Sequence, residues 1–260
     1  MHRLHLLKFN LTRLINAFIY HPSPVLFDHI PKCAGNAVIN YLLRFYTEHE
    51  TYNFDGVHFR ESAKSFLNLP SKKQSKYNLI YGHSANLLID VVKEETKIIT
   101  ILRDPIDRII SHYYYIKTYK GHFLHDTLIK DQIALKDYCA LNLSNDLENE
   151  YIVHFSGLSV DEVRVNPERA LELAEKNILS KYDLIGFQSN LTDFFLSFSK
   201  MMNLPTQKIS NKQVNKTSKR LKLSELDEET LNGIKKFNQL DIQFYDRIRS
   251  FMKQGVIQKK

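Results

Sequence analysis

A lysine and a glycine lie in a turn between two patterned segments near the start of the chain. Residues 25–27 form an apolar run, the sequence Pro-Lys-Cys-Ala-Gly-Asn-Ala follows at 31–37, and apolar residues then recur at helical spacing. The first N–H groups of a helix lack intrahelical acceptors and the helix dipole favours negative charge there. Gly35 would let the backbone approach an anion, and Lys32 would add a positive charge. The stretch alone fits a phosphate or sulfate site and an ordinary basic surface turn equally well.

This turn is not a Walker A loop. That motif places its lysine directly after the second glycine and follows it with Ser or Thr, whose hydroxyl binds Mg²⁺. Here Lys32 precedes Gly35, and Cys33 follows the lysine. A nucleophilic role for Cys33 is conceivable, but no clear histidine partner is evident for it. We therefore expect Cys33 to contribute its backbone.

Arg103 and Ser111 form a second candidate anion site. Arg103 follows the β-branched run at 97–102, and Asp104 and Pro105 are typical of a helix start directly after it. A guanidinium can bind a phosphate through two hydrogen bonds, and the Ser111 hydroxyl, two helical turns on, can add another. Asp104 and Arg108 have the spacing of an i,i+4 ion pair on the surface of this helix.

Strand-like and helical segments alternate along the chain, which predicts an α/β fold. We expect three layers in a P-loop-like arrangement, with a central, mainly parallel sheet flanked by helices. The predicted strands lie at 25–28, 77–83, 97–102 and 183–187. Ligands of such sheets bind beyond the carboxyl ends of the strands. Lys32, His83 and Arg103 each stand at or just past such an end, so we expect them to meet in one crevice.

His83 is a candidate general base because imidazole titrates near neutral pH. The chain has 11 histidines, and a histidine at a strand end is often only a hydrogen-bonded structural residue. The other candidates for the base are His29, His58, His112 and His154. His112 follows Ser111 on the predicted helix and is expected to point elsewhere.

Composition describes an ordinary globular chain of 260 residues with a basic excess. Hydrophobic residues are 43% and charged residues 25%, and the net charge is +7. That charge suits a polyanionic partner such as a nucleotide, a nucleic acid, a sulfated glycan or an anionic lipid, without choosing among them. The two cysteines, Cys33 and Cys139, form neither a disulfide framework nor a metal cluster.

The N-terminal segment lacks the features of a membrane span or an export signal. The uncharged run at 14–27 is too short to cross a bilayer and contains Pro22 and Pro24. Residues 4–20 are apolar with Lys8 and Arg13 interspersed, so they could form a helix that packs on the domain or makes weak contact with a membrane surface. We expect an N-terminal helical arm at 1–24, one domain at 25–250 and a basic tail at 251–260.

The two candidate anion sites resemble the motifs of one enzyme family. Ile-Pro-Lys-Cys-Ala-Gly-Asn at 30–36 looks like the 5′-phosphosulfate loop of sulfotransferases that use 3′-phosphoadenosine 5′-phosphosulfate (PAPS). The segment from Ile101 to Tyr115 looks like their 3′-phosphate motif. Tyr81-Gly82-His83, the segment at 174–187 and the basic Asn215-Lys216-Thr217 loop extend the likeness in the same order. The chain is most similar to the heparan sulfate and uronyl 2-O-sulfotransferase branch over most of 25–250.

The resemblance implies a role for each matching residue. Lys32 would stabilise charge on the leaving 3′,5′-diphosphate (PAP), and His83 would be the general base for in-line transfer. The 5′-phosphosulfate would be held by Pro31, Lys32, Cys33, Ala34, Gly35, Asn36 and Ala37. Arg103 and Ser111 would bind the 3′-phosphate, and Lys216 and Thr217 would close over the nucleotide. PAPS is thus the expected co-substrate, PAP the product, and no metal is needed.

Three departures from the family pattern are visible in the sequence. Asn36 and Ala37 stand where family loops usually carry Thr or Ser, and Tyr81 stands where the 2-O branch often has the first histidine of His-Gly-His. Val153 replaces an arginine of a segment found in related carbohydrate sulfotransferases. The animal members are anchored in the Golgi, whereas this chain shows no anchor, so we expect a cytoplasmic, bacterial protein.

The sequence therefore predicts an O-sulfotransferase that acts on a sugar hydroxyl in a glycan, oligosaccharide or glycolipid. It names neither the acceptor nor the hydroxyl, leaves a homo-oligomer open, and gives no reason to expect a nucleic-acid partner. Two alternatives are a P-loop-like nucleotide kinase or NTPase, and a non-catalytic polyanion-binding protein that uses the basic loop at 208–222. A degenerate PAPS-binding protein without turnover is a third.

Overall fold

A computed structural model describes residues 2–54, 58–141, 143–206 and 220–253, and the side chains from residue 11 onward. The chain divides into two compact units. The first unit comprises Met1–Leu102, Lys181–Val214 and Gln258–Lys260, and the second comprises Arg103–Ser180 and Asn215–Ile257. The predicted boundaries at 24 and 250 stay predictions.

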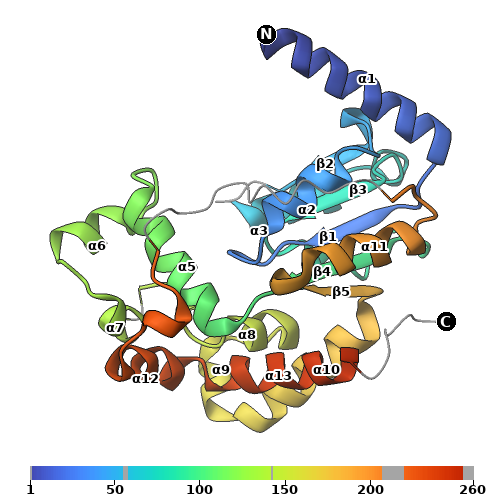
Figure 1. Ribbon diagram of the computed structural model, residues 1–260. Coiled ribbons are helices and arrows are strands. Elements are labelled where there is room, and N and C mark those ends of the chain that lie inside the picture. The colour runs from blue at the N-terminus through green and yellow to red at the C-terminus, as the bar shows by residue number, and fades with distance from the viewer. Residues whose placement is uncertain (1, 55–57, 142, 207–219, 254–260) are drawn as a thin grey trace. The chain divides into compact units, whose positions relative to one another are not determined.

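The first unit is built on a five-stranded parallel sheet in the order β2-β3-β1-β4-β5 (Figure 1). The strands are β1 (Val25–Asp28), β2 (Thr51–Asn53), β3 (Leu79–Gly82), β4 (Lys97–Leu102) and β5 (Leu184–Phe187). The helices of this unit are α1 (His2–Tyr20), α2 (Gly35–Leu42), α3 (Phe59–Leu67), α4 (Ser71–Gln74) and α11 (Leu191–Met201). The expected α/β class, with a parallel central sheet flanked by helices, is confirmed.

Burial explains why these short runs are strands. All four residues of the central strand β1 are buried, and β4 is buried from its second residue onward. Continuous apolar runs of this kind are typical of parallel strands that are covered on both faces. Strand β2 was not expected, because the region 47–76 is polar in sequence and offered no apolar run that would indicate a strand at the edge of the sheet.

The second unit is helical. Its helices are α5 (Pro105–Thr118), α6 (His125–Lys130), α7 (Leu135–Tyr138), α8 (Glu150–Ser156), α9 (Val160–Val165), α10 (Pro167–Lys181), α12 (Glu228–Phe237) and α13 (Gln239–Lys253). Helix α5 begins as predicted, because the Asp104 side chain accepts a hydrogen bond from the Asp107 backbone N–H at 2.9 Å and Pro105 takes the first helical position. Its apolar face packs in a core that includes Ile109, Ile116 and Tyr138.

The register of the sheet fixes what lies at its carboxyl edge. Asp28 on β1 pairs with Gly82 on β3, and Asp28 also pairs with Thr100 on β4. The residues that follow Asp28 and Gly82, His29 and His83, therefore leave the sheet side by side. The loop that contains Lys32 follows His29 directly and leads into α2.

Candidate functional site

The loop between β1 and α2 has an unusual backbone conformation. Lys32 and Ala34 both adopt left-handed φ angles, 67° and 68°, although neither is glycine. L-residues avoid this region, and such strain is concentrated at functional sites and ligand clamps. Alternation of right- and left-handed residues turns successive backbone N–H groups toward one point, which forms an anion-binding concavity. The loop leads into the N-terminus of the eight-residue helix α2, which adds its dipole.

Packing against His29 requires a glycine at position 35, the start of α2. A Cβ atom built on Gly35 would lie 1.8 Å from Nε2 of His29. The His29 imidazole therefore fills the space that any larger residue at 35 would need. We call residues 30–34, the predicted anion site, the anion loop. The contact between Gly35 and His29 links this loop to the histidine at the end of β1.

His83 lies at the end of β3 in a defined orientation. Its Nδ1 is 2.8 Å from the carbonyl oxygen of His29, and the two imidazole rings stack with their centroids 4.4 Å apart. Because a carbonyl oxygen only accepts, Nδ1 must carry the proton of this hydrogen bond. In neutral His83 the lone pair is then on Nε2, which is the arrangement that a general base needs.

His29, one of the sequence candidates for the base, lies instead beside His83 and accepts a hydrogen bond from its ring through the backbone carbonyl. It is stacked between Phe27, at 5.6 Å and 16°, and His83. Burial lowers the pKa of His29 to about 3, with the nearby charges of His83 and Lys32 acting in the same direction and Asp28 opposing them. His29 is therefore neutral at physiological pH. Only its place directly past β1 could have indicated this role.

The last residue of β1, directly before His29, is a buried aspartate. Asp28 is fully buried and accepts hydrogen bonds from the Tyr182 hydroxyl at 2.5 Å and from the Asn86 backbone N–H at 3.3 Å. The Thr100 hydroxyl donates to the Asp28 carbonyl at 2.9 Å. These bonds join β1 to β4 and to the segments after β3 and before β5, so they hold the edge of the sheet from which the loop and His83 emerge.

The second candidate anion site belongs to the second unit. Arg103 is 8% exposed and directs Nε to Oδ2 of Asp107 at 2.7 Å. Arg220 binds the other oxygen of the same carboxylate at 2.5 Å. Burial lowers the pKa of Arg220, the charge of Arg103 lowers it further, and Asp107 opposes both. Two guanidinium groups thus share one carboxylate and keep a net positive charge.

Arg220 is a residue that sequence analysis missed as an individual. It was noticed only as one of several basic residues in 208–222, where nothing distinguished it from a solvated loop residue. Ser111, the other predicted ligand of this site, is half-buried on α5. Lys216 and Thr217, predicted to close over the nucleotide, lie outside the described residues.

The predicted ion pair between Asp104 and Arg108 is replaced by other contacts. Arg108 is fully buried rather than on the helix surface, donates to the Asp146 carbonyl at 2.8 Å and lies 5.6 Å from the centre of the Tyr151 ring. The i,i+4 pair on this turn is Arg103–Asp107 instead. Asp104 is occupied with capping the helix.

The other candidate bases have different surroundings. His112 is buried in the second unit with its Nδ1 2.9 Å from the Tyr138 hydroxyl, as expected for a structural residue. His58 is exposed at the start of α3, and His154 packs edge-on against Phe155. Cys33 is buried with its sulfur 3.6 Å from the Pro31 carbonyl, which favours a structural role for its side chain.

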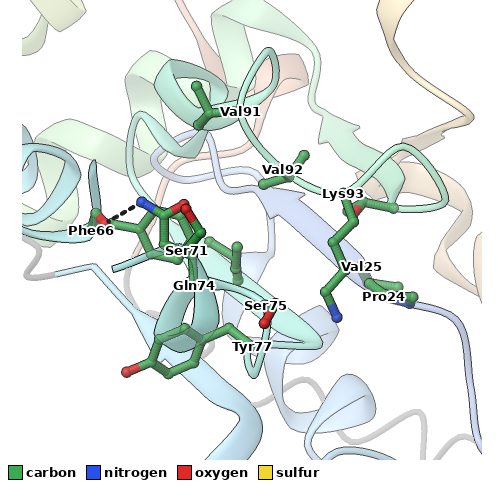
Figure 2. A pocket seen from close by; sticks show the side chains of 12 residues that line it. Pro24, Val25, Phe66, Ser71, Gln74, Ser75, Tyr77, Val91, Val92 and Lys93 are labelled. Atoms are coloured by element: carbon green, nitrogen blue, oxygen red, sulfur yellow. Dashed lines mark hydrogen bonds between the residues drawn. The ribbon is translucent and has the colours of Figure 1, made fainter. Parts of the chain in front are cut away.

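A hollow in the first unit lies near the start of strands β1 and β3, at the opposite end of these strands from His29 and His83 (Figure 2). Its lining includes Val25, the first residue of β1, and Tyr77, just before β3. Gln74 on this wall is held by a hydrogen bond to the Phe66 carbonyl at 3.1 Å. Among the residues that line the hollow, the one charged residue is Lys93. The hollow is therefore unrelated to the predicted anion site.

Comparison with known proteins agrees with this architecture. A five-stranded parallel sheet flanked by helices, with a loop that leads from its central strand into α2, is consistent with a sulfotransferase fold. The model of the sulfotransferase family matches residues 16–246, and the chain therefore belongs to that family.

Among curated proteins, the chain is similar to heparan sulfate 2-O-sulfotransferase 1 from Gallus gallus, with 26% identity over 189 residues. The enzyme of the same name from Homo sapiens is 24% identical over 189 residues. Each match covers 66% of this chain and 52% of the relative. A heparin sulfate O-sulfotransferase from Drosophila melanogaster is 24% identical over 190 residues, which are 65% of this chain and 53% of that protein. The chain spans about half the length of the curated relatives it matches.

Proposed function

We propose that this protein transfers a sulfuryl group from PAPS to a hydroxyl of a carbohydrate. One observation supports the proposal most directly. The first unit contains both a loop with left-handed residues at Lys32 and Ala34 and a histidine, His83, whose Nε2 can accept a proton. Membership of the sulfotransferase family supports sulfuryl transfer, and relatives named as heparan sulfate O-sulfotransferases support a carbohydrate acceptor.

Residues 31–37 bind the 5′-phosphosulfate in this proposal. The backbone N–H groups of the loop and the N-terminus of α2 bind its oxygens, so they are positioned before the reaction begins and need no reorganisation. Asn36 and Ala37 supply no Ser or Thr hydroxyl. The 5′-phosphosulfate is therefore bound mainly by backbone N–H groups and by Lys32. Lys32 neutralises the charge that develops on the bridging oxygen as the bond to sulfur breaks.

His83 acts as the general base. Its Nε2 takes the proton of the acceptor hydroxyl while the acceptor oxygen attacks sulfur in line. The new O–S bond forms as the bond between sulfur and the phosphate oxygen breaks, and PAP leaves. The His29 carbonyl keeps the proton on Nδ1 throughout, so His29 is a positioning residue.

Arg103, Ser111 and Arg220 bind the 3′-phosphate. The carboxylate of Asp107 keeps both guanidinium groups in place and leaves part of their donor capacity for a second anion. The 3′-phosphate distinguishes PAPS from ATP, so this site provides nucleotide specificity. Lys216 and Thr217 cover the nucleotide in the same proposal.

Calorimetry with PAP and AMP, which differ only in the 3′-phosphate, tests the nucleotide assignment. The wild type should bind PAP at least about tenfold more tightly than AMP, because charge-assisted hydrogen bonds are worth about 1.5–3 kcal/mol. Arg103→Ala should remove that difference and leave AMP binding unchanged. Arg247→Ala, which removes an exposed pair with Glu175 in the same unit, is the matched control.

Two results would contradict the assignment. Equal affinity of the wild type for PAP and AMP would exclude a 3′-phosphate site. Preference for ATP over PAP would support the kinase or NTPase alternative instead.

A further inference from the structure

In the part of helix α1 whose side chains are described, large apolar side chains are exposed, and Arg13 and Asn16 contact the protein. Within the part of the helix whose side chains are described, Arg13 is 9% exposed and donates hydrogen bonds to the Tyr46 carbonyl and to the Thr51 hydroxyl. Asn16 donates to the Arg44 carbonyl at 3.0 Å. Polar contacts therefore attach this helix to the first unit.

The outward face of α1 is a continuous apolar stripe. Its members are exposed and recur at the three- and four-residue steps of one helix face: Leu11, Leu14, Ile15, Phe18 and Ile19. Phe18 is 77% exposed. Single exposed apolar residues need no explanation, but a contiguous stripe marks a surface that binds something.

Charge identifies the kind of partner. The first 27 residues contain Arg3, Lys8 and Arg13 and no Asp or Glu, the first acidic residue being Asp28. The whole chain carries a net charge of +7. A segment with basic and no acidic residues that also carries an apolar helix face suits a surface that is both apolar and negatively charged, which describes a bilayer that contains anionic lipids. A second copy of α1 would bring like charges together.

We propose that α1 lies in the interface of an anionic membrane with its apolar stripe buried among the lipids. None of the described helices is long and apolar enough to cross a membrane, so the attachment would be peripheral. Leu14 and Phe18 supply the buried area. The net positive charge of the chain, together with the lack of acidic residues before Asp28, supplies an attraction to lipid headgroups that salt weakens. The proposal is independent of the catalytic assignment, because it uses no residue of that site.

Co-sedimentation of the full chain with vesicles tests this proposal. The protein should bind vesicles of mixed phosphatidylglycerol and phosphatidylcholine at least tenfold more tightly than vesicles of phosphatidylcholine alone. Leu14→Ser/Phe18→Ser should lower the affinity for the anionic vesicles at least tenfold. Phe123→Ser/Val165→Ser, which removes equally exposed apolar side chains from the second unit, should not change it; Phe123 is 74% and Val165 85% exposed.

Circular dichroism and PAP affinity show whether each variant is folded. Absence of wild-type binding to the anionic vesicles, or unchanged binding by folded Leu14→Ser/Phe18→Ser, would overturn the proposal. A dimer in sedimentation velocity that this variant dissociates would assign the stripe to a second copy instead. Unaltered sulfuryl transfer by the variant in solution would leave the catalytic assignment intact.

Discussion

In the proposed mechanism His83 and His29 act as a pair, because two neighbouring strands end at the same level. Asp28 pairs with Gly82, and the next residue of each strand is a histidine. The carbonyl of His29 orients the His83 ring through Nδ1, and its own imidazole supports that ring by stacking. Since His29 has a pKa of about 3, it adds no competing positive charge near neutral pH.

We expect His83→Ala to lower the turnover number by roughly 10²–10⁴-fold, the usual contribution of a positioned base. Its affinity for PAP should be unchanged, because the histidine acts on the acceptor hydroxyl. Turnover with PAPS and calorimetry with PAP measure the two effects separately. His49→Ala, at an exposed histidine of the same unit, should leave both unchanged. Turnover that survives in His83→Ala would mean that another group is the base.

Which individual residues can be predicted from sequence depends on whether their role is local. Lys32, His83 and Arg103 stand out because each follows an apolar run, and the position of His83 at the strand end is confirmed. His29 and Arg220 were not chosen as site residues, because their roles depend on a strand register and on a contact across more than a hundred residues, between Arg220 and Asp107. Arg108 was assigned to the surface by helix spacing, whereas tertiary packing buries it.

At the scale of elements, the junction of β1 with α2 depends on a match between Gly35 and His29. A Cβ at position 35 would overlap the imidazole, so one of the two must move. Movement of His29 would also release His83, and movement of α2 would distort the anion loop. A change at Gly35 is therefore expected to affect both the anion loop and His83, the proposed base.

Gly35→Ala should reduce both the melting temperature and PAP affinity. Overpacking of this kind typically costs about 1–3 kcal/mol. The cost should be smaller in a His29→Ala background, because the side chain that the new methyl group meets is then absent. A thermal-unfolding double-mutant cycle measures this coupling. If Gly35→Ala and His29→Ala had additive effects on the free energy of unfolding, the His29 ring would not be what excludes a side chain at position 35.

The elements themselves were largely predictable. Strands β1, β3, β4 and β5 are rich in apolar residues, and the Asp-Pro start of α5 is a local signal that the structure confirms. Strand β2 has no such run and forms only through pairing with β3. For residues 4–20 the sequence offered two alternatives, a helix that packs on the domain and one that contacts a membrane surface. In the described part of α1, polar side chains contact the first unit and the apolar stripe is exposed.

At the scale of the whole molecule, the residues that we propose as the site are divided between two units. The first unit holds the anion loop, His29 and His83, and the second holds Arg103, Ser111 and Arg220. The family match from 16 to 246 includes both. The division follows the chain, because Leu102 is the last residue of β4 and Arg103 the first of the second unit. The sequence indicated α/β alternation but not this division.

Transfer of ³⁵S from labelled PAPS to a panel of glycans, oligosaccharides and glycolipids tests the central claim most directly. The wild type should place label on at least one carbohydrate. Lys32→Ala should abolish transfer, because charge on the leaving phosphate is then left without its cation. A wild type that binds PAP but labels no carbohydrate, or a Lys32→Ala variant that transfers label at the wild-type rate, would contradict the account.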